Sequence, residues 1–356
     1  MKIIEGANAA LECWSNGVMG RMRITALRRT IAVMIVCIAN LGSAAAVHAQ
    51  LRKINIAYTA TSPYQAVLIV AKEVGLFKKH NLDPTLVFTT GGSLGIQAML
   101  GGDVAMTLSD GSSSVGSKLA GVDVLVIASL LNTFPYSLIS LPEIKKVDQL
   151  RGAKIAVSRF GSATDLSVKM ALARLGLNAE KDVTLLQIGV QTARYAAMVS
   201  KNVQATIITP PFTLTARKAG MNTLIDMGEL NIPFQLTGML ALRPYLKSNP
   251  DMVLSVIRVL SEGIHFYKRE KEATLKILGK YLKTDDREAL EETHREIAVK
   301  SLPEKPYPTL AGIKTILDET ALRNPKAKGM RPEDFVDSSF VKKVDDEGLF
   351  ERLYRR

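Results

Sequence analysis

The sequence predicts an α/β protein with two doubly wound lobes joined by a two-strand hinge, on three observations. Two segments, beginning at Leu51 and at Leu150, match at an offset of 99 residues. Each segment alternates short apolar strands with amphipathic helices, which is typical of a mostly parallel sheet. Residues 245–356 are largely helical and charged, with too little strand pattern for a third sheet.

The repeat depends on a few identities that share one offset. Leu51-Arg52 matches Leu150-Arg151, and Ile56-Ala57 matches Ile155-Ala156. Further along, Val104 matches Val203. So few identities leave a chance match as the alternative, but the shared order of elements favours duplication or structural equivalence.

Each unit reads as strand, helix, strand, helix, strand. The second strand follows a helix of about a dozen residues, as in a right-handed parallel crossover. The predicted strands are 54–58, 84–89 and 104–108 in the first unit and 154–157, 183–188 and 205–208 in the second. The predicted helices are 64–77 and 94–100, then 164–175 and 193–200.

Extended-looking stretches at 134–140 and 236–241 flank the second unit, and two such crossings would form a hinge. The predicted organisation is therefore a signal peptide at 1–49, a first lobe from 50–138 with 241–356, and a second lobe from 139–240. The C-terminal helices are expected to pack back against one of the two units.

The N-terminus has the pattern of a secretory signal peptide. Four arginines between Arg21 and Arg29 precede an apolar run at 31–41, and Val47-His48-Ala49 is a small-x-Ala cleavage site. The run is too short for a membrane anchor, which needs about 20 residues. Acidic residues before Met19 do not suit a signal, so translation is expected to start at Met19 or Met22. We expect a periplasmic protein cut after Ala49.

Composition argues against catalysis, metals and nucleic acid. Both cysteines, Cys13 and Cys37, precede the expected cut, so the mature chain has no thiol ligand or nucleophile. His80, His265 and His294 each lie in a charged, helix-like stretch and are expected at the surface. The mature chain keeps 41 Lys+Arg and 32 Asp+Glu, scattered without the basic blocks of a nucleic-acid binder. We expect no cofactor and no metal.

The glycine-rich segment 91–111 is not a phosphate loop, because it lacks the required Gly-Lys-Ser/Thr ending. Gly91-Gly92-Ser93 instead opens a short helix, with Ser93 as its expected N-cap. Small residues at such a turn let a solute approach backbone N–H groups that have no partner in the helix. The alternative is an ordinary strand-to-helix turn. Ligands of open α/β sheets bind beyond the carboxyl ends of the strands, which favours a polar cleft.

The sequence resembles the type II periplasmic solute-binding proteins of ABC importers, in the branch that binds nitrate, sulfonates, taurine and thiamine-pyrimidine precursors. The resemblance lies in AKEVGLFKKHNLDPTLV, GIQAMLGGDVAM, VDQLRGAKIAVSRFGSATD, DVTLLQIG, AAMVSKNVQATIITPP and DFVDSSFV. It implies a monomer that captures a small polar or anionic molecule between its lobes. It also implies delivery of that molecule to an ABC permease with its ATPase.

The resemblance places ligand contacts in the turns after corresponding strands. The residues it implies are Ser62, Tyr64, Gln65, Gly92, Ser93, Ser109, Asp110, Asn132, Ser162, Thr164, Gln191, Thr209 and Pro210. Tyr64 and Phe160 would cover an apolar part of the ligand or lie in the lobe cores. Asp110 would bind a donor or positive group of the ligand, or would only cap the helix that starts near Gly111.

Three other functions compete. A pyrimidine synthase shares the lobe pattern but uses a cofactor-anchoring lysine, histidines and a cysteine cluster, and the mature chain has no cysteine. A transcription regulator with this fold would carry an N-terminal helix-turn-helix instead of a signal peptide. A periplasmic protein that delivers its ligand to a sensor or to a non-ABC transporter stays open.

Overall fold

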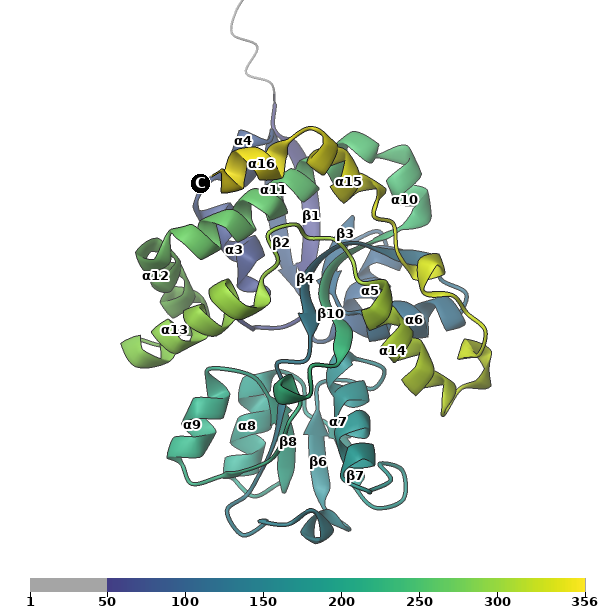
Figure 1. Ribbon diagram of the computed structural model, residues 1–356, viewed down its shortest axis with the longest axis vertical. Helices are drawn as coiled ribbons and strands as arrows, with labels where there is room; N and C mark the ends of the chain where they lie inside the picture. The colour runs from purple at the N-terminus through teal and green to yellow at the C-terminus, as the bar shows by residue number, and fades with distance from the viewer. Residues whose placement is uncertain (1–49, 356) are drawn as a thin grey trace, which may run out of the picture. The chain divides into compact units, whose positions relative to one another are not determined.

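The computed structural model describes residues 50–355, and the predicted signal peptide at 1–49 lies outside this range. Residues 51–356 make one structural unit, which contains two five-stranded sheets, each with its own helices. Figure 1 shows the first sheet with most of the helices above and the second sheet with α7, α8 and α9 below. The fold is therefore α/β with two sheets, as the sequence predicts.

The first sheet takes strands from both sides of the second sheet in the sequence. Its order is β2-β1-β3-β10-β4. β1 runs parallel to β2 and β3, whereas β10 runs antiparallel to β3 and β4. The strands are β1 (Arg52–Tyr58), β2 (Leu82–Phe88), β3 (Met106–Ser109), β4 (Val124–Thr133) and β10 (Pro233–Leu242).

The second sheet has the equivalent order, β7-β6-β8-β5-β9. β6 is parallel to β7 and β8, and β5 is antiparallel to β8 and β9. Its strands are β5 (Ser137–Ser140), β6 (Lys154–Val157), β7 (Thr184–Gln187), β8 (Ala205–Ile208) and β9 (Asn222–Asp226). Both sheets are mixed, although the sequence predicted mostly parallel ones. The reason is that the first strand after each crossing, β5 in the second sheet and β10 in the first, runs antiparallel to both of its neighbours.

The sequence offset of 99 residues reappears in the strand pairing. In the first sheet Ile56 pairs with Leu86 and Met106. In the second sheet Ile155 pairs with Leu185 and Ala205. Every number differs by 99, so the two β-strand trios superpose in register. The structural equivalence predicted from a few identities is confirmed.

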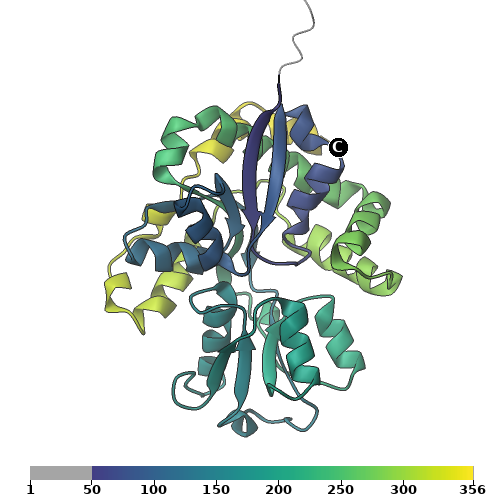
Figure 2. The ribbon, with the colours of Figure 1, turned by 180° about the vertical axis from the view of Figure 1, so that it is seen from behind.

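Two helical layers cover the first sheet, and Figures 1 and 2 show them from opposite sides. One layer packs around α11, and the other packs α5 and α14 against α6. The first layer contains α3 (Ala66–Glu73), α11 (Pro250–Arg269), α12 (Lys271–Leu282), α15 (Ser339–Asp346) and α16 (Leu349–Tyr354). The second contains α5 (Gly92–Leu100), α6 (Gly111–Leu119) and α14 (Leu310–Ala321).

The remaining helices are shorter or belong to the second sheet. The second sheet carries α7 (Ala163–Arg174), α8 (Gln191–Val199) and α9 (Phe212–Lys218). The others are α4 (Leu76–Lys79), α10 (Arg243–Ser248), α13 (Arg287–His294) and a π-helix at Arg295–Ser301. The predicted long helix 64–77 is interrupted, because Gly75 takes a left-handed φ of 79° between α3 and α4.

The chain crosses between the sheets at residues 134–136 and 227–232. The second predicted crossing, 236–241, lies instead inside β10, which pairs with β3 and β4. The Phe134 and Phe234 rings contact each other beside these crossings, with centroids 3.9 Å apart. The lobe boundaries at 138/139 and 240/241 stay a prediction.

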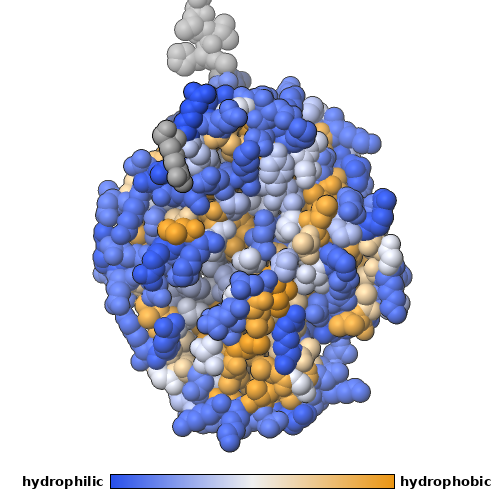
Figure 3. All heavy atoms as spheres, viewed as in Figure 1, coloured by the Kyte–Doolittle hydropathy of each residue, from blue (hydrophilic) through white to orange (hydrophobic). Residues whose placement is uncertain are grey.

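One apolar core runs through both sheets, and a smaller cluster lies in the second sheet around Met198 and Ile208. His294 belongs to the buried part, with its Nε2 2.9 Å from the Tyr267 carbonyl oxygen, so its predicted surface position is wrong. The face in Figure 3 is mostly hydrophilic, with its largest apolar cluster over the second sheet and smaller apolar patches elsewhere. Within residues 50–355, no helix combines the length and apolarity needed to cross a membrane.

Candidate functional site

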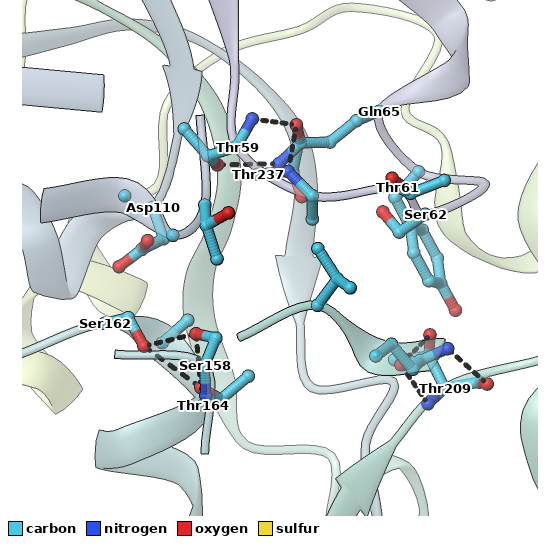
Figure 4. A pocket seen from close by; sticks show the side chains of 18 of the residues that line it. Thr59, Thr61, Ser62, Gln65, Asp110, Ser158, Ser162, Thr164, Thr209 and Thr237 are labelled. Carbon is cyan, nitrogen blue, oxygen red and sulfur yellow. Dashed lines mark hydrogen bonds between the residues drawn. The ribbon is translucent and has the colours of Figure 1, made fainter. Parts of the chain in front are cut away.

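A cavity of about 70 Å³ lies where the two sheets face each other. Its wall consists mainly of the turns that follow β1, β2, β3, β6, β7 and β8, so the carboxyl ends of both parallel trios meet there. Figure 4 shows hydroxyl, amide and carboxyl groups pointing into this space from both sides. Ligands of α/β proteins bind in this place in the fold.

Nine of the thirteen residues predicted from the sequence line the cavity. They are Ser62, Tyr64, Gln65, Gly92, Asp110, Ser162, Thr164, Gln191 and Thr209. Four do not line it: Ser93, Ser109, Asn132 and Pro210. Ser109 is 1% exposed within β3, and Asn132 accepts a hydrogen bond from Ser129 at 2.6 Å. Phe160, the proposed aromatic cover, is 51% exposed and is not part of the wall.

The N-cap prediction for Ser93 is wrong. Helix α5 begins at Gly92, so its N-cap is Gly91, whose φ is 80°. Glycine tolerates this left-handed backbone and has no side chain to bond the helix. Ser93 is therefore already inside the first turn. The turn still brings bare backbone to the cavity, because Gly91 and Gly92 both line it.

The turns after β1 and β6 are equivalent, and in each the N–H of the first residue after the strand bonds a side chain six residues further along the chain. The Thr59 N–H donates to Gln65 Oε1 at 2.7 Å, and the Ser158 N–H donates to Thr164 Oγ1 at 2.9 Å. These two pairs differ by 99 residues, so the repeat extends into the site. A third hydrogen bond of this kind joins the start of α8 to the turn after β8, where Gln191 Oε1 accepts from the Thr209 N–H at 3.0 Å. These side chains shape the wall, which limits how many of their polar atoms are left for a ligand.

Three hydroxyl groups form a triangle at the start of α7. Ser158 Oγ lies 2.9 Å from Ser162 Oγ and 2.8 Å from Thr164 Oγ1, and the last two are 3.0 Å apart. Ser162 Oγ also lies 2.7 Å from the Arg159 carbonyl oxygen. The three hydroxyl groups therefore have three protons for four oxygen–oxygen contacts. The triangle keeps no hydroxyl proton free for a ligand.

Asp110 is the N-cap of α6, which is one of the two alternatives left by the sequence. Its Oδ1 accepts from the Ser113 N–H at 2.9 Å and from the Ser112 hydroxyl, and its Oδ2 accepts from Ser113 Oγ at 2.9 Å. Burial raises the pKa of Asp110, while these bonds and the Ala163 N–H act in the opposite direction.

Arg194 is the main cavity residue absent from the sequence prediction. It lies in the first turn of α8, it is 3% exposed, and burial lowers its pKa to about 10, with Tyr136 acting against the shift. Its NH1 donates to the Gly189 carbonyl at 2.6 Å and its NH2 to the Ile207 carbonyl at 3.1 Å. The sequence did contain an indication of this position, because Arg194 lies three residues after the predicted site residue Gln191 and therefore shares its helix face.

Ion pairs link helices that belong to different sheets at the sides of the cavity. Arg174 in α7 lies 3.7 Å from Glu319 in α14. Lys218 in α9 lies 3.2 Å from Glu288 in α13. These pairs connect the two halves of the molecule, and partly exposed pairs of this kind contribute little to stability. Within residues 50–355, no group of three His, Asp or Glu side chains is arranged to hold a metal ion.

Curated relatives point to binding proteins. A Brucella abortus (strain 2308) protein is 26% identical over 236 residues, which cover 65% of this chain and 72% of that one. YtlA of Bacillus subtilis (strain 168) is 26% identical over 218 residues, covering 59% of this chain and 64% of that one. Both relatives are named as inferred binding proteins.

Solved structures share the two-sheet fold. The alkanesulfonate-binding protein SsuA of Xanthomonas axonopodis pv. citri, bound to MOPS, is 19% identical with a TM-score of 0.67, covering 82% of this chain and 99% of that one. The periplasmic nitrate-binding protein NrtA of Synechocystis PCC 6803 is 13% identical with a TM-score of 0.65, covering 86% and 89%. These identities establish the fold alone.

The sequence matches the family described as NMT1/THI5 like over residues 62–273, which is more than half of the chain. This range includes both crossings between the sheets and every residue that lines the cavity except Thr59, Ala60 and Thr61. The protein therefore belongs to the NMT1/THI5-like family and has the fold of periplasmic binding proteins.

Proposed function

We propose that the protein is exported, captures a small organic molecule in the cavity between its two sheets, and delivers it to an ABC importer. The observation that carries the proposal is the cavity itself, which is enclosed by the strand-end turns of both sheets. The names of its structural neighbours, SsuA and NrtA, support a polar or anionic ligand and a periplasmic location.

The wall chemistry suits binding better than catalysis. Its side chains are mainly hydroxyl and amide groups that already bond one another, such as Gln65 with Thr59 and Gln191 with Thr209. Among residues 50–355, no histidine or lysine lines the cavity. A preorganised polar wall of this kind orients a ligand by hydrogen bonds without offering a general base at its centre.

A ligand screen with a matched pair of variants tests capture. The probes are short sulfonates, nitrate, aromatic carboxylates, amino acids and pyrimidines, measured by thermal shift and then by calorimetry. A bound probe raises the melting temperature with concentration by mass action. Thr61→Trp fills the cavity and is expected to abolish the shift, whereas Thr223→Trp, at an exposed position in β9, leaves it unchanged.

Two results would contradict capture in this cavity. One is a bound probe whose affinity is the same in Thr61→Trp and in the parent protein. The other is a failure of every probe together with the absence of any small molecule released on denaturing protein purified from its natural host. Delivery is tested separately, by uptake of the identified ligand in cells with and without the protein.

A further inference from the structure

Arg194 brings a buried positive charge to the cavity without a counter-charge. Among residues 50–355, no carboxylate forms an ion pair with Arg194 within 4.0 Å. Within the described part of the chain, the one titratable group that affects the pKa of Arg194 is the Tyr136 phenol, whose own pKa is raised by burial, so that it is neutral at ordinary pH. Burial of a charge without a partner is unfavourable, because the group loses water and gains no ion pair. Such a residue is expected where a ligand supplies the opposite charge.

The guanidinium also has donors to spare. An arginine side chain carries five N–H groups, and the carbonyls of Gly189 and Ile207 take two of Arg194's, which leaves three. Its Nε is buried and has no hydrogen-bond partner in the protein. Since Arg194 lines the cavity, an oxyanion bound against it would meet a guanidinium that has unused donors.

Three helix starts add positive potential at the same place. Gly92, Ala163 and Gln191 are the first residues of α5, α7 and α8, and all three line the cavity. None of these helices has a side-chain hydrogen bond at its N-cap. The first N–H groups of a helix and its dipole favour an anion.

Among the described residues that line the cavity, Asp110 is the one carboxylate, and it offers a cation little free acceptor capacity. Asp110 already receives the Ser112 hydroxyl and both the N–H and hydroxyl of Ser113. Three donors therefore occupy a group that has about four acceptor positions. A ligand ammonium would find about one free acceptor position there. The cavity is therefore asymmetric, with free donors near Arg194 and few free acceptors near Asp110.

We infer that Arg194 anchors the ligand through a carboxylate or sulfonate group, and that the rest of the ligand carries no positive charge. The inference rests on the proposed function and narrows its ligand class. Neutral pyrimidines and amino acids with a free ammonium group are predicted to bind poorly. The alternative role is structural, in which Arg194 only ties the β7–α8 turn to the end of β8 through its two carbonyl bonds.

Matched acid and amide probes separate these roles. The probes are propionate with propionamide, ethanesulfonate with ethanesulfonamide, and benzoate with benzamide, each measured by calorimetry. In the parent protein the acid is expected to bind about 10- to 100-fold more tightly than its amide, the range of a hydrogen bond to a charged group. In Arg194→Gln, which keeps an amide donor for the carbonyls, this ratio is expected to fall close to one.

The control is Arg217→Gln, which removes the same charge from an exposed position of α9 and is expected to keep the full acid-to-amide ratio. An unchanged ratio in Arg194→Gln, or equal binding of amide and acid by the parent protein, overturns the inference. A second measurement identifies by mass spectrometry the molecule released from protein purified from its natural host. A neutral or cationic molecule that Thr61→Trp no longer retains overturns the anchor while leaving capture in the cavity intact.

Discussion

Gly92, at the start of α5, lies close to Asp110, the N-cap of α6. An added methyl group at Gly92 is therefore expected to lower the stability of the protein. A Cβ at Gly92 would come closer than 3.0 Å to Ser113 Oγ, Asp110 Oδ2 and Ser109 Oγ. All three atoms are on short side chains, which have little freedom to retreat. The left-handed backbone belongs to Gly91, so the effect of Gly92→Ala is a matter of space, without a strained φ.

The expected cost has two parts. Forcing a methyl group into a packed site costs about 1–3 kcal/mol. Turning Asp110 away breaks its 2.9 Å bond to the Ser113 N–H, and loss of an N-cap costs about 1 kcal/mol. Gly92→Ala is therefore predicted to lower the free energy of unfolding by about 2–4 kcal/mol.

Gly116 provides the matched control. It lies in α6, and nothing is within 4 Å of a Cβ built on it. Gly116→Ala is expected to stabilise the protein by about 0.5–1 kcal/mol, because alanine is the better helix former. Urea denaturation of ligand-free protein, followed by circular dichroism, measures both variants. A free energy of unfolding for Gly92→Ala equal to that of the parent would refute the packing described here.

Two further predictions concern charges outside the cavity. Burial acts to raise the pKa of Glu262, but the bonds from His80 and Lys79 lower it more, so its net pKa is below the ordinary value. A lowered carboxyl pKa contributes stability above the unfolded pKa that is lost as pH falls through the folded pKa. Glu262→Gln is thus expected to reduce the melting temperature near neutral pH, and the difference from the parent should shrink as the solution becomes more acidic than pH ~4. Removing the Arg174–Glu319 pair by Glu319→Gln is expected to cost roughly 0.2–1 kcal/mol in dilute buffer, and urea titration in about 1 M salt should show no difference.

The order of the elements follows from local sequence patterns. The predicted strands 154–157 and 205–208 coincide with β6 and β8, because short apolar runs between turn residues have few other solutions. The offset of 99 residues was visible for the same reason, since both units place apolar residues at equivalent positions. The antiparallel directions of β5 and β10 were not visible, because they depend on which sheet each strand joins after a crossing.

The candidate site residues also divide into those that local sequence patterns predict and those that they do not. Nine turn residues could be placed at the cavity because they directly follow parallel strands, whose carboxyl ends share one edge of a sheet. Ser93 was misplaced because the helix start depends on the backbone conformation of Gly91, which lies two residues before the predicted cap. Helix ends are set by such local geometry and are difficult to place from residue type alone.

The sequence by itself determined two α/β units, their equivalence and the turns that carry polar groups, because these features depend on residues close together in the chain. Only the tertiary structure decided the burial and the hydrogen-bond partners of Asp110 and Arg194. Burial raises the pKa of the Asp110 carboxyl group, and the Arg194 guanidinium donates to a carbonyl from the end of β8. Burial and hydrogen-bond partners determine whether a charged group has capacity left for a ligand, and both depend on segments brought together by folding.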